Sequence, residues 1–225
     1  MIGLRLSVPA LVLAAGLVLP MTAGAAEWGW APKQWNPLAR ADAVKQLSSP
    51  HFQERRRALG RLAEVGTPED VPLMLQRLWD ENAMVRGMAE QAIWGLWLRV
   101  DDPVLTPVFQ TGIYHVMERK LDDAIEKFNL VILLKPMFAE AWNKRGDAYL
   151  HKGDYDRALA DYLHALELNP YHFGVMESCG EIWLERRDAR KAAEYFRRAL
   201  EINPNLWNVA LILRELEQLL EKDRI

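Results

Sequence analysis

Glycine recurs at intervals of 34 residues in the second half of this chain, at Gly112, Gly146 and Gly180. A fixed period of this length indicates a row of similar structural units that stack, because one such unit cannot bury its apolar face alone. Three further sets of residues keep the same interval: Ala124, Ala158 and Ala192; Phe128, Tyr162 and Phe196; Pro136, Pro170 and Pro204.

Each recurring residue type has a physical task in a pair of antiparallel helices. Glycine and alanine let the two helices approach closely, and the aromatic residue fills the space beside them. Proline cannot continue a helix, so it ends the unit. No segment shows the alternation of apolar and polar residues that predicts a strand. The period therefore predicts helical hairpins.

At these residues the chain resembles the tetratricopeptide repeat (TPR) family. The resemblance implies three repeats, at 105–138, 139–172 and 173–206. The first is the least typical, since Val108 stands where the second has Trp142. Residues 207–225 continue a helical pattern and are expected to form a capping helix and tail. The middle repeat carries the family pattern most fully, at Trp142, Gly146, Tyr149, Ala158, Tyr162, Ala165 and Pro170.

Residues 38–102 carry a weaker repeat with an offset of 31 residues. This region is similar to HEAT-type repeats, which are also paired helices, and a generic helical bundle is the alternative. Asp101-Asp102-Pro103 is the expected joint with the TPR array. The matching positions are Leu47, Arg55, Ala58 and Leu62 in the first copy and Leu78, Arg86, Ala89 and Ile93 in the second.

Taken together, the patterns predict an all-α fold, a right-handed α-solenoid of stacked antiparallel helix pairs. We expect eleven helices: two HEAT-like pairs, three TPR pairs and one capping helix. Residues 26–37 precede them and contain Trp28, Trp30 and Trp35 among prolines. This segment is expected to be an extended strap. Its tryptophans either close the apolar end of the solenoid or contact a partner or a membrane interface.

The N-terminus has the features of a secretory signal peptide over residues 1–25. One positive charge, Arg5, precedes an apolar run over residues 8–19, and Ala23 and Ala25 form an A-x-A cleavage pattern. The expected location is periplasmic or otherwise secreted, with no transmembrane segment in the mature chain. An uncleaved anchor is the alternative. The single cysteine, Cys179, cannot form an internal disulfide.

The sequence contains no recognisable catalytic, cofactor or metal motif. The chain has a net charge of −3, which disfavours a broad nucleic-acid-binding surface. Cys179 is expected to be a small core residue, and the five histidines lack metal-ligand spacing. A basic cluster over residues 55–57 with Arg61 is interpreted as ion-paired with neighbours such as Glu54 and Glu64. A contact with an anionic ligand is the alternative for this cluster.

The TPR resemblance implies that a protein or peptide ligand would lie along the first helix of each repeat. The predicted groove is apolar at one end and acidic along the rest, and a solvated helix face is the alternative explanation of the acids. The predicted groove residues are Phe109, Ile113, Asn143, Asp147, Glu177, Glu181 and Glu185.

These observations predict an exported, non-catalytic adaptor or scaffold that binds a partner protein or peptide in the cell envelope. An alternative is a factor associated with an envelope polymer or carbohydrate, in which tryptophans stack on sugars. An enzyme of unrecognised type is the third hypothesis.

The signal-peptide assignment predicts a processed N-terminus. Cleavage after Ala25 or Ala26 leaves Ala26 or Glu27 as the first residue, because small residues precede the cut. Mass spectrometry of the protein from an envelope fraction should show one of these termini. An intact Met1 in the cytoplasmic fraction would contradict both the processing and the location.

Overall fold

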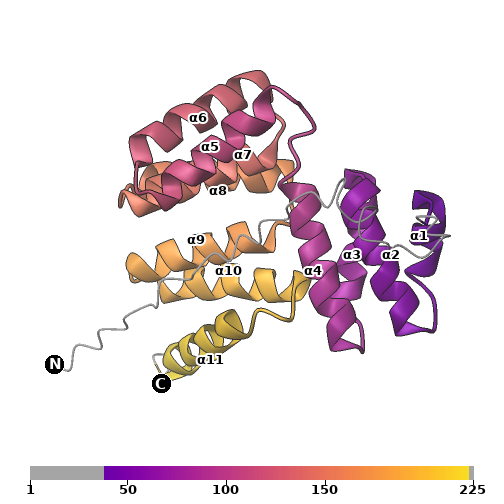
Figure 1. Cartoon of the computed structure of the whole chain (residues 1–225). Coiled ribbons are helices and arrows are strands. Elements are labelled where there is room, and N and C mark those ends of the chain that lie inside the picture. Colours follow the sequence, from indigo (N-terminus) through magenta and orange to yellow (C-terminus); the bar gives the residue numbers. More distant parts are fainter. Residues whose placement is uncertain (1–37, 223–225) are drawn as a thin grey trace. The chain divides into compact units, whose positions relative to one another are not determined.

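A computed structural model describes residues 38–222, and all of its regular elements are helical (Figure 1). The predicted signal peptide and the tryptophan strap lie outside the described residues. The described part contains eleven α-helices, which confirms the predicted all-α class and helix number. They are α1 (Arg40–Gln46), α2 (Phe52–Val65), α3 (Val71–Leu75), α4 (Ala83–Trp97), α5 (Leu105–Met117), α6 (Leu121–Leu134), α7 (Ala139–His151), α8 (Tyr155–Leu168), α9 (Phe173–Glu185), α10 (Ala189–Ile202) and α11 (Trp207–Lys222).

Helices α1 to α4 form two successive helix pairs that share one arginine interaction. Arg55 of α2 donates to the carbonyl oxygens of Ser49 and Pro50, in the turn before its own helix. Arg86 of α4 donates to the carbonyls of Asp80 and Glu81, which lie 31 residues further along in each case. The 31-residue offset therefore describes a structural repeat, while its assignment to HEAT-type repeats stays a prediction.

The first helix of the second pair is short. Helix α3 has five residues and lies between two 3₁₀ turns, η1 (Pro68–Asp70) and η2 (Gln76–Trp79). Pro68 and Pro72 stand at the starts of η1 and α3, where a missing backbone N–H costs no helical hydrogen bond. A capping box between Thr67 and Asp70 fixes the entry to this segment.

Helices α5 to α10 form three antiparallel pairs in which a glycine faces an aromatic ring. A Cβ atom at Gly112 would lie 2.6 Å from the ring of Phe128, and one at Gly146 would lie 2.6 Å from Tyr162. At Gly180 the distance to the ring of Phe196 would be 2.4 Å. The rings are fully buried. Glycine is therefore required at these positions because the aromatic residue rests directly on the backbone of the first helix.

The turns inside the three pairs also repeat. Arg119, Gly153 and Arg187 are 34 residues apart, and each has a positive φ of 60° to 75°. Asp154 and Asp188 follow the second and third of these residues and cap α8 and α10, since their side chains accept from the backbone N–H three residues later. The 34-residue period thus extends from packing to turn geometry.

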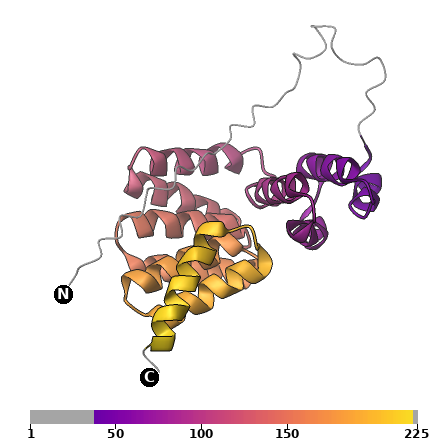
Figure 2. The same cartoon turned by 90° about the horizontal axis from the view of Figure 1, so that it is seen from below.

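Helix α4 contacts the second and third TPR pairs rather than continuing the stack onto the first. The ring of Trp97 stacks on His172 at 4.4 Å between centroids, and Trp94 packs edge-on against Phe173. Arg86 donates to Asn205 in the connection between α10 and α11. Figures 1 and 2 show α4 beside the ends of α9 and α10. The segment over residues 101–103 therefore redirects the chain instead of extending one row of helices.

One apolar core joins the two regions. The cluster that contains Leu59 and Ile93 of the N-terminal pairs also contains Tyr162 and Phe173 of the TPR pairs. None of the described helices has both the length and the apolarity that a bilayer-spanning helix needs.

The glycine–aromatic contact predicts opposite effects for two Gly→Ala substitutions in helices. Gly180→Ala places a methyl group against Phe196 and should lower the free energy of unfolding by about 1–3 kcal/mol. Gly87→Ala in α4 meets no atom within 4 Å, so it should raise the same quantity by about 0.5–1 kcal/mol through helix propensity. Urea unfolding measures both. Equal effects would show that the assigned repeat register is wrong.

Candidate protein-binding groove

Three of the predicted acidic residues meet on the facing surfaces of α7 and α9. Glu177, Glu181 and Glu185 follow one face of α9, and Asp147 of α7 is close enough to interact with Glu181. Burial raises the pKa of Glu181 to about 7, with further increases from the charges of Glu177, Asp147 and Glu185. We refer to these four residues as the acidic strip.

Asp147 is held in place by two neighbours. Lys144 lies one turn earlier on α7 and places its Nζ 2.9 Å from Asp147 Oδ2. The hydroxyl of Tyr162, on α8, donates to Asp147 Oδ1 at 2.8 Å. The Tyr162 ring is the same ring that rests on Gly146. The repeat packing therefore fixes the position of one carboxylate of the strip.

Helix α4 adds a fifth carboxylate at the other side of α9. Burial raises the pKa of Glu177, and the charge of Glu90 on α4 raises it further. The sequence gave no local signal for Glu90, because it belongs to the N-terminal region and reaches the strip only through the docking of α4. The free protein therefore brings five carboxylates together, and the described residues place one ammonium group, that of Lys144, beside them.

One end of the groove is filled by a buried polar network. His172 caps α9 through Nδ1, which accepts from the backbone N–H of Val175, so its ring proton lies on Nε2, 3.3 Å from Glu140. Asn143 donates to Glu140 at 2.7 Å. Burial acts to raise the pKa of Glu140, but His172, Lys144 and the hydrogen bonds lower it to about 2. Glu140 is therefore a structural anion.

Two predicted groove residues are corrected by their burial. Asn143 is 3% exposed and is occupied by the network around Glu140, so it does not face a ligand. Phe109 is 1% exposed and packs against the rings of Phe128 and Phe138 in the core of the first TPR pair. Ile113 is half-buried against the same core. The predicted apolar end of the groove is thus mainly core, whereas the acidic part faces solvent in part.

The other candidate residues from the sequence have structural roles. Cys179 is fully buried, and burial raises its pKa to about 12, as expected for a core thiol. Arg55 makes a bidentate pair with buried Asp80, and Arg61 pairs with Glu64 at 2.6 Å. Ion pairing therefore explains much of the basic cluster, although Glu54 accepts from Ser49 instead. Within residues 38–222, no three His, Cys, Asp or Glu residues are placed to hold a metal ion.

Comparison with family models identifies the repeats. A model described as "Tetratricopeptide repeat" matches residues 139–172, and a second model with the same description matches residues 184–206. The chain therefore contains tetratricopeptide repeats, and it contains a module that serves protein–protein interaction rather than, typically, catalysis.

Curated relatives match the repeats only. A TPR repeat-containing protein of Rhizobium etli is 33% identical over 61 residues, which are 27% of this chain and 30% of that protein. The chloroplastic TPR domain-containing protein PYG7 of Arabidopsis thaliana is 37% identical over 71 residues, which are 31% of this chain and 24% of PYG7. The matches thus span less than a third of the length of either relative.

Solved structures show partial likeness. The first TPR of Spaghetti (RPAP3), bound to the HSP90 peptide SRMEEVD, has a TM-score of 0.49 and 21% identity, and covers 52% of this chain and 93% of that chain. The crystal structure of MamA has a TM-score of 0.42 and 20% identity, and covers 71% of this chain and 92% of that chain.

The raised pKa of Glu181 predicts a pH-dependent stability. Between the ordinary pKa of 4.5 and the folded value of about 7, the folded protein retains a proton that the unfolded chain releases, so stability falls as pH rises through this window. Glu181→Gln removes this effect. It should raise the free energy of unfolding by roughly 2 kcal/mol at pH 8, after allowance for partial exposure, and by little at pH 4.5.

Urea unfolding of both proteins at the two pH values measures the difference. Glu201→Gln, at an exposed position of α10, is the matched control and should have a small effect at both pH values. An effect of Glu181→Gln that is the same at pH 4.5 and pH 8 would contradict the assigned charge cluster.

Proposed function

We propose that this TPR protein is an exported adaptor of the cell envelope, and that its acidic strip docks a basic segment of a partner protein. The TPR repeats support protein binding, and the strip supplies the ligand chemistry. The features of residues 1–25 support export. No catalytic constellation is part of the proposal.

The observation that carries the proposal is the unrelieved repulsion among the carboxylates of α7 and α9. Ion pairs in this part of the protein give Lys144 to Asp147, while Glu177, Glu181 and Glu185 have no cation within ion-pair distance in the described residues. Burial of these groups adds a desolvation cost to the repulsion. A ligand that brings lysine or arginine into the groove would remove both costs, so the free energy of binding gains from a basic ligand and not from an acidic one.

The same geometry indicates which part of the strip is accessible. The network of His172 and Glu140 and the ring of Trp94 on Gly174 fill the end at which α9 begins. Glu185 lies at the exposed C-terminal end of α9, and Glu181 is partly exposed one turn before it. We therefore expect the ligand to lie across Asp147, Glu181 and Glu185, and Glu177 to act mainly through its charge.

The proposal predicts a preference between two matched peptides. A dodecapeptide that alternates lysine with leucine should bind, and the peptide with glutamate in place of every lysine should not. Affinity should fall as salt is raised, because exposed charges are screened. The double variant Glu181→Lys/Glu185→Lys should weaken binding of the basic peptide about tenfold or more. Fluorescence anisotropy of labelled peptides measures these affinities at two salt concentrations.

A matched variant separates the strip from the net charge of the chain. Glu167→Lys/Glu201→Lys makes the same change in net charge at exposed positions of α8 and α10, and it should leave peptide affinity unchanged. Equal loss in the two double variants would assign the effect to net charge. Failure of the basic peptide to bind the unaltered protein would overturn the proposed ligand class.

A further inference from the structure

Between repeats, the structure always stacks one row of a first helix against the second helix of the preceding repeat. In α7 this row includes Ala141 and Ala148, which are fully buried against the α6 core. In α9 it includes Val175 and Ile182, which are fully buried in the cluster that contains α8. Burial of this row is therefore the normal state of a first helix in this array.

Helix α5 exposes the equivalent row. Val104 and Tyr114 occupy the positions that precede the α7 residues Phe138 and Ala148 by 34, and they are 72% and 56% exposed. Pro107, the equivalent of Ala141, is exposed as well. The partners of α4 lie on α9 and in the α10–α11 connection, so the N-terminal pairs leave this row of α5 uncovered within the described residues.

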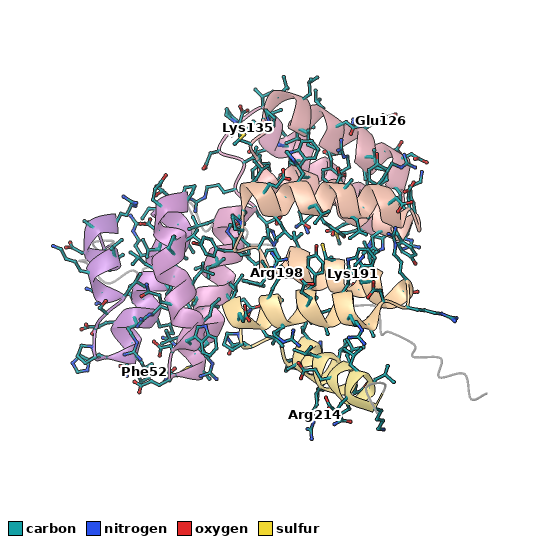
Figure 3. All side chains as sticks on the ribbon, turned by 180° about the vertical axis from the view of Figure 1, so that it is seen from behind. Phe52, Glu126, Lys135, Lys191, Arg198 and Arg214 are labelled. Carbon is teal, nitrogen blue, oxygen red and sulfur yellow. The ribbon has the colours of Figure 1, made fainter. Side chains whose placement is uncertain are left out.

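Helix α6 extends the apolar surface. Leu130 and Leu134 are one turn apart and are 41% and 58% exposed. The equivalents of Leu130 in the next two repeats are His164 and Arg198, the latter labelled on α10 in Figure 3. The first repeat therefore carries leucine where the others carry a polar residue. We call the following six residues the open face: Val104, Pro107, Thr111, Tyr114, Leu130 and Leu134.

We propose that the open face is the interface of a symmetric dimer, in which it packs against the open face of a second copy of this chain. In a two-fold interface each side chain lies near its own copy, so a charged residue there would repel itself. Helix α5 has no Asp, Glu, Lys or Arg between Leu105 and Met117. Lys127, one turn before Leu130 and half-buried, is the charged neighbour on α6. This absence of charge favours self-association over a partner chosen by charge.

The other end of the array favours a closed dimer over a chain of copies. Helix α11 occupies the place of a fourth first helix, and Arg214 stands where the three repeats have Gly112, Gly146 and Gly180. Arg214 is exposed on α11 (Figure 3). An arginine at this position prevents an aromatic ring from resting on the backbone, so a further helix cannot pack there as in the repeats. Head-to-tail growth through α11 is thereby disfavoured.

The area of the open face sets the expected affinity. Partly exposed side chains of this number offer on the order of 600 Å² per copy, which is at the low end for specific interfaces, about 1,200 Å² in total. We therefore expect a weak dimer with a dissociation constant in the micromolar range. Such a dimer would present two acidic strips, and a partner with two basic segments would gain avidity from it.

Analytical ultracentrifugation of the purified chain over about 1–200 μM tests the dimer, whose expected strength follows from the small interface area. The unaltered protein should show a reversible monomer–dimer equilibrium. Tyr114→Lys should raise the dissociation constant on the order of 100-fold, because both copies then bury a charge at the interface. Circular dichroism should show unchanged helicity, since Tyr114 is exposed within one copy.

Two matched variants fix the location of the interface. Leu163→Lys on α8 and Leu219→Lys on α11 change leucines of comparable exposure, and both should leave the equilibrium unchanged. A monomer at every concentration would overturn the proposal. Dissociation by Leu219→Lys would overturn it in favour of head-to-tail contact, and dissociation by Leu163→Lys would move the interface to α8.

Discussion

The contact between a helix backbone and an aromatic ring sets the geometry on which this structure depends. Phe128, Tyr162 and Phe196 each lie where a Cβ atom on the facing glycine would be 2.4–2.6 Å away, so the two helices of a pair approach as closely as the ring allows. The same spacing in all three pairs makes them alike, and like units stack in register. The carboxylates of α7 and α9 face one another because of this register, and Tyr162 also donates directly to Asp147.

The N-terminal pairs modify this array by docking beside it. Trp97 stacks on His172 while His172 caps α9 and faces Glu140, so one residue links the docked helix α4, the helix start and the buried anion. Arg86 fixes the same docking at Asn205, as its counterpart Arg55 fixes Asp80 within the N-terminal pairs. This arrangement closes one end of the acidic strip, and it leaves the first TPR pair without a neighbour on its open face.

The sequence predicted what the 34-residue period determines and missed what the docking of α4 determines. Glycines, rings, turns and the acidic row of α9 follow from spacing along one helix, so Glu181 and Glu185 could be placed on a common face. Phe109 could not be recognised as core, because the family position alone does not say how far a side chain extends from the helix axis. Asn143 and Glu90 depend on contacts between regions far apart in the chain, for which the sequence offers no periodic signal.

Hydrogen exchange of backbone amides, with and without the bound lysine–leucine peptide, tests the central claim most directly, because it reports the bound surface without altering the protein. The proposed docking predicts slower exchange in α7 and α9, around Asp147 and over Glu181–Glu185, with α2 and the outer face of α10 unchanged. Slower exchange confined to the N-terminal pairs or to α11, with α7 and α9 unaffected, would contradict the assignment of the acidic strip as the binding surface.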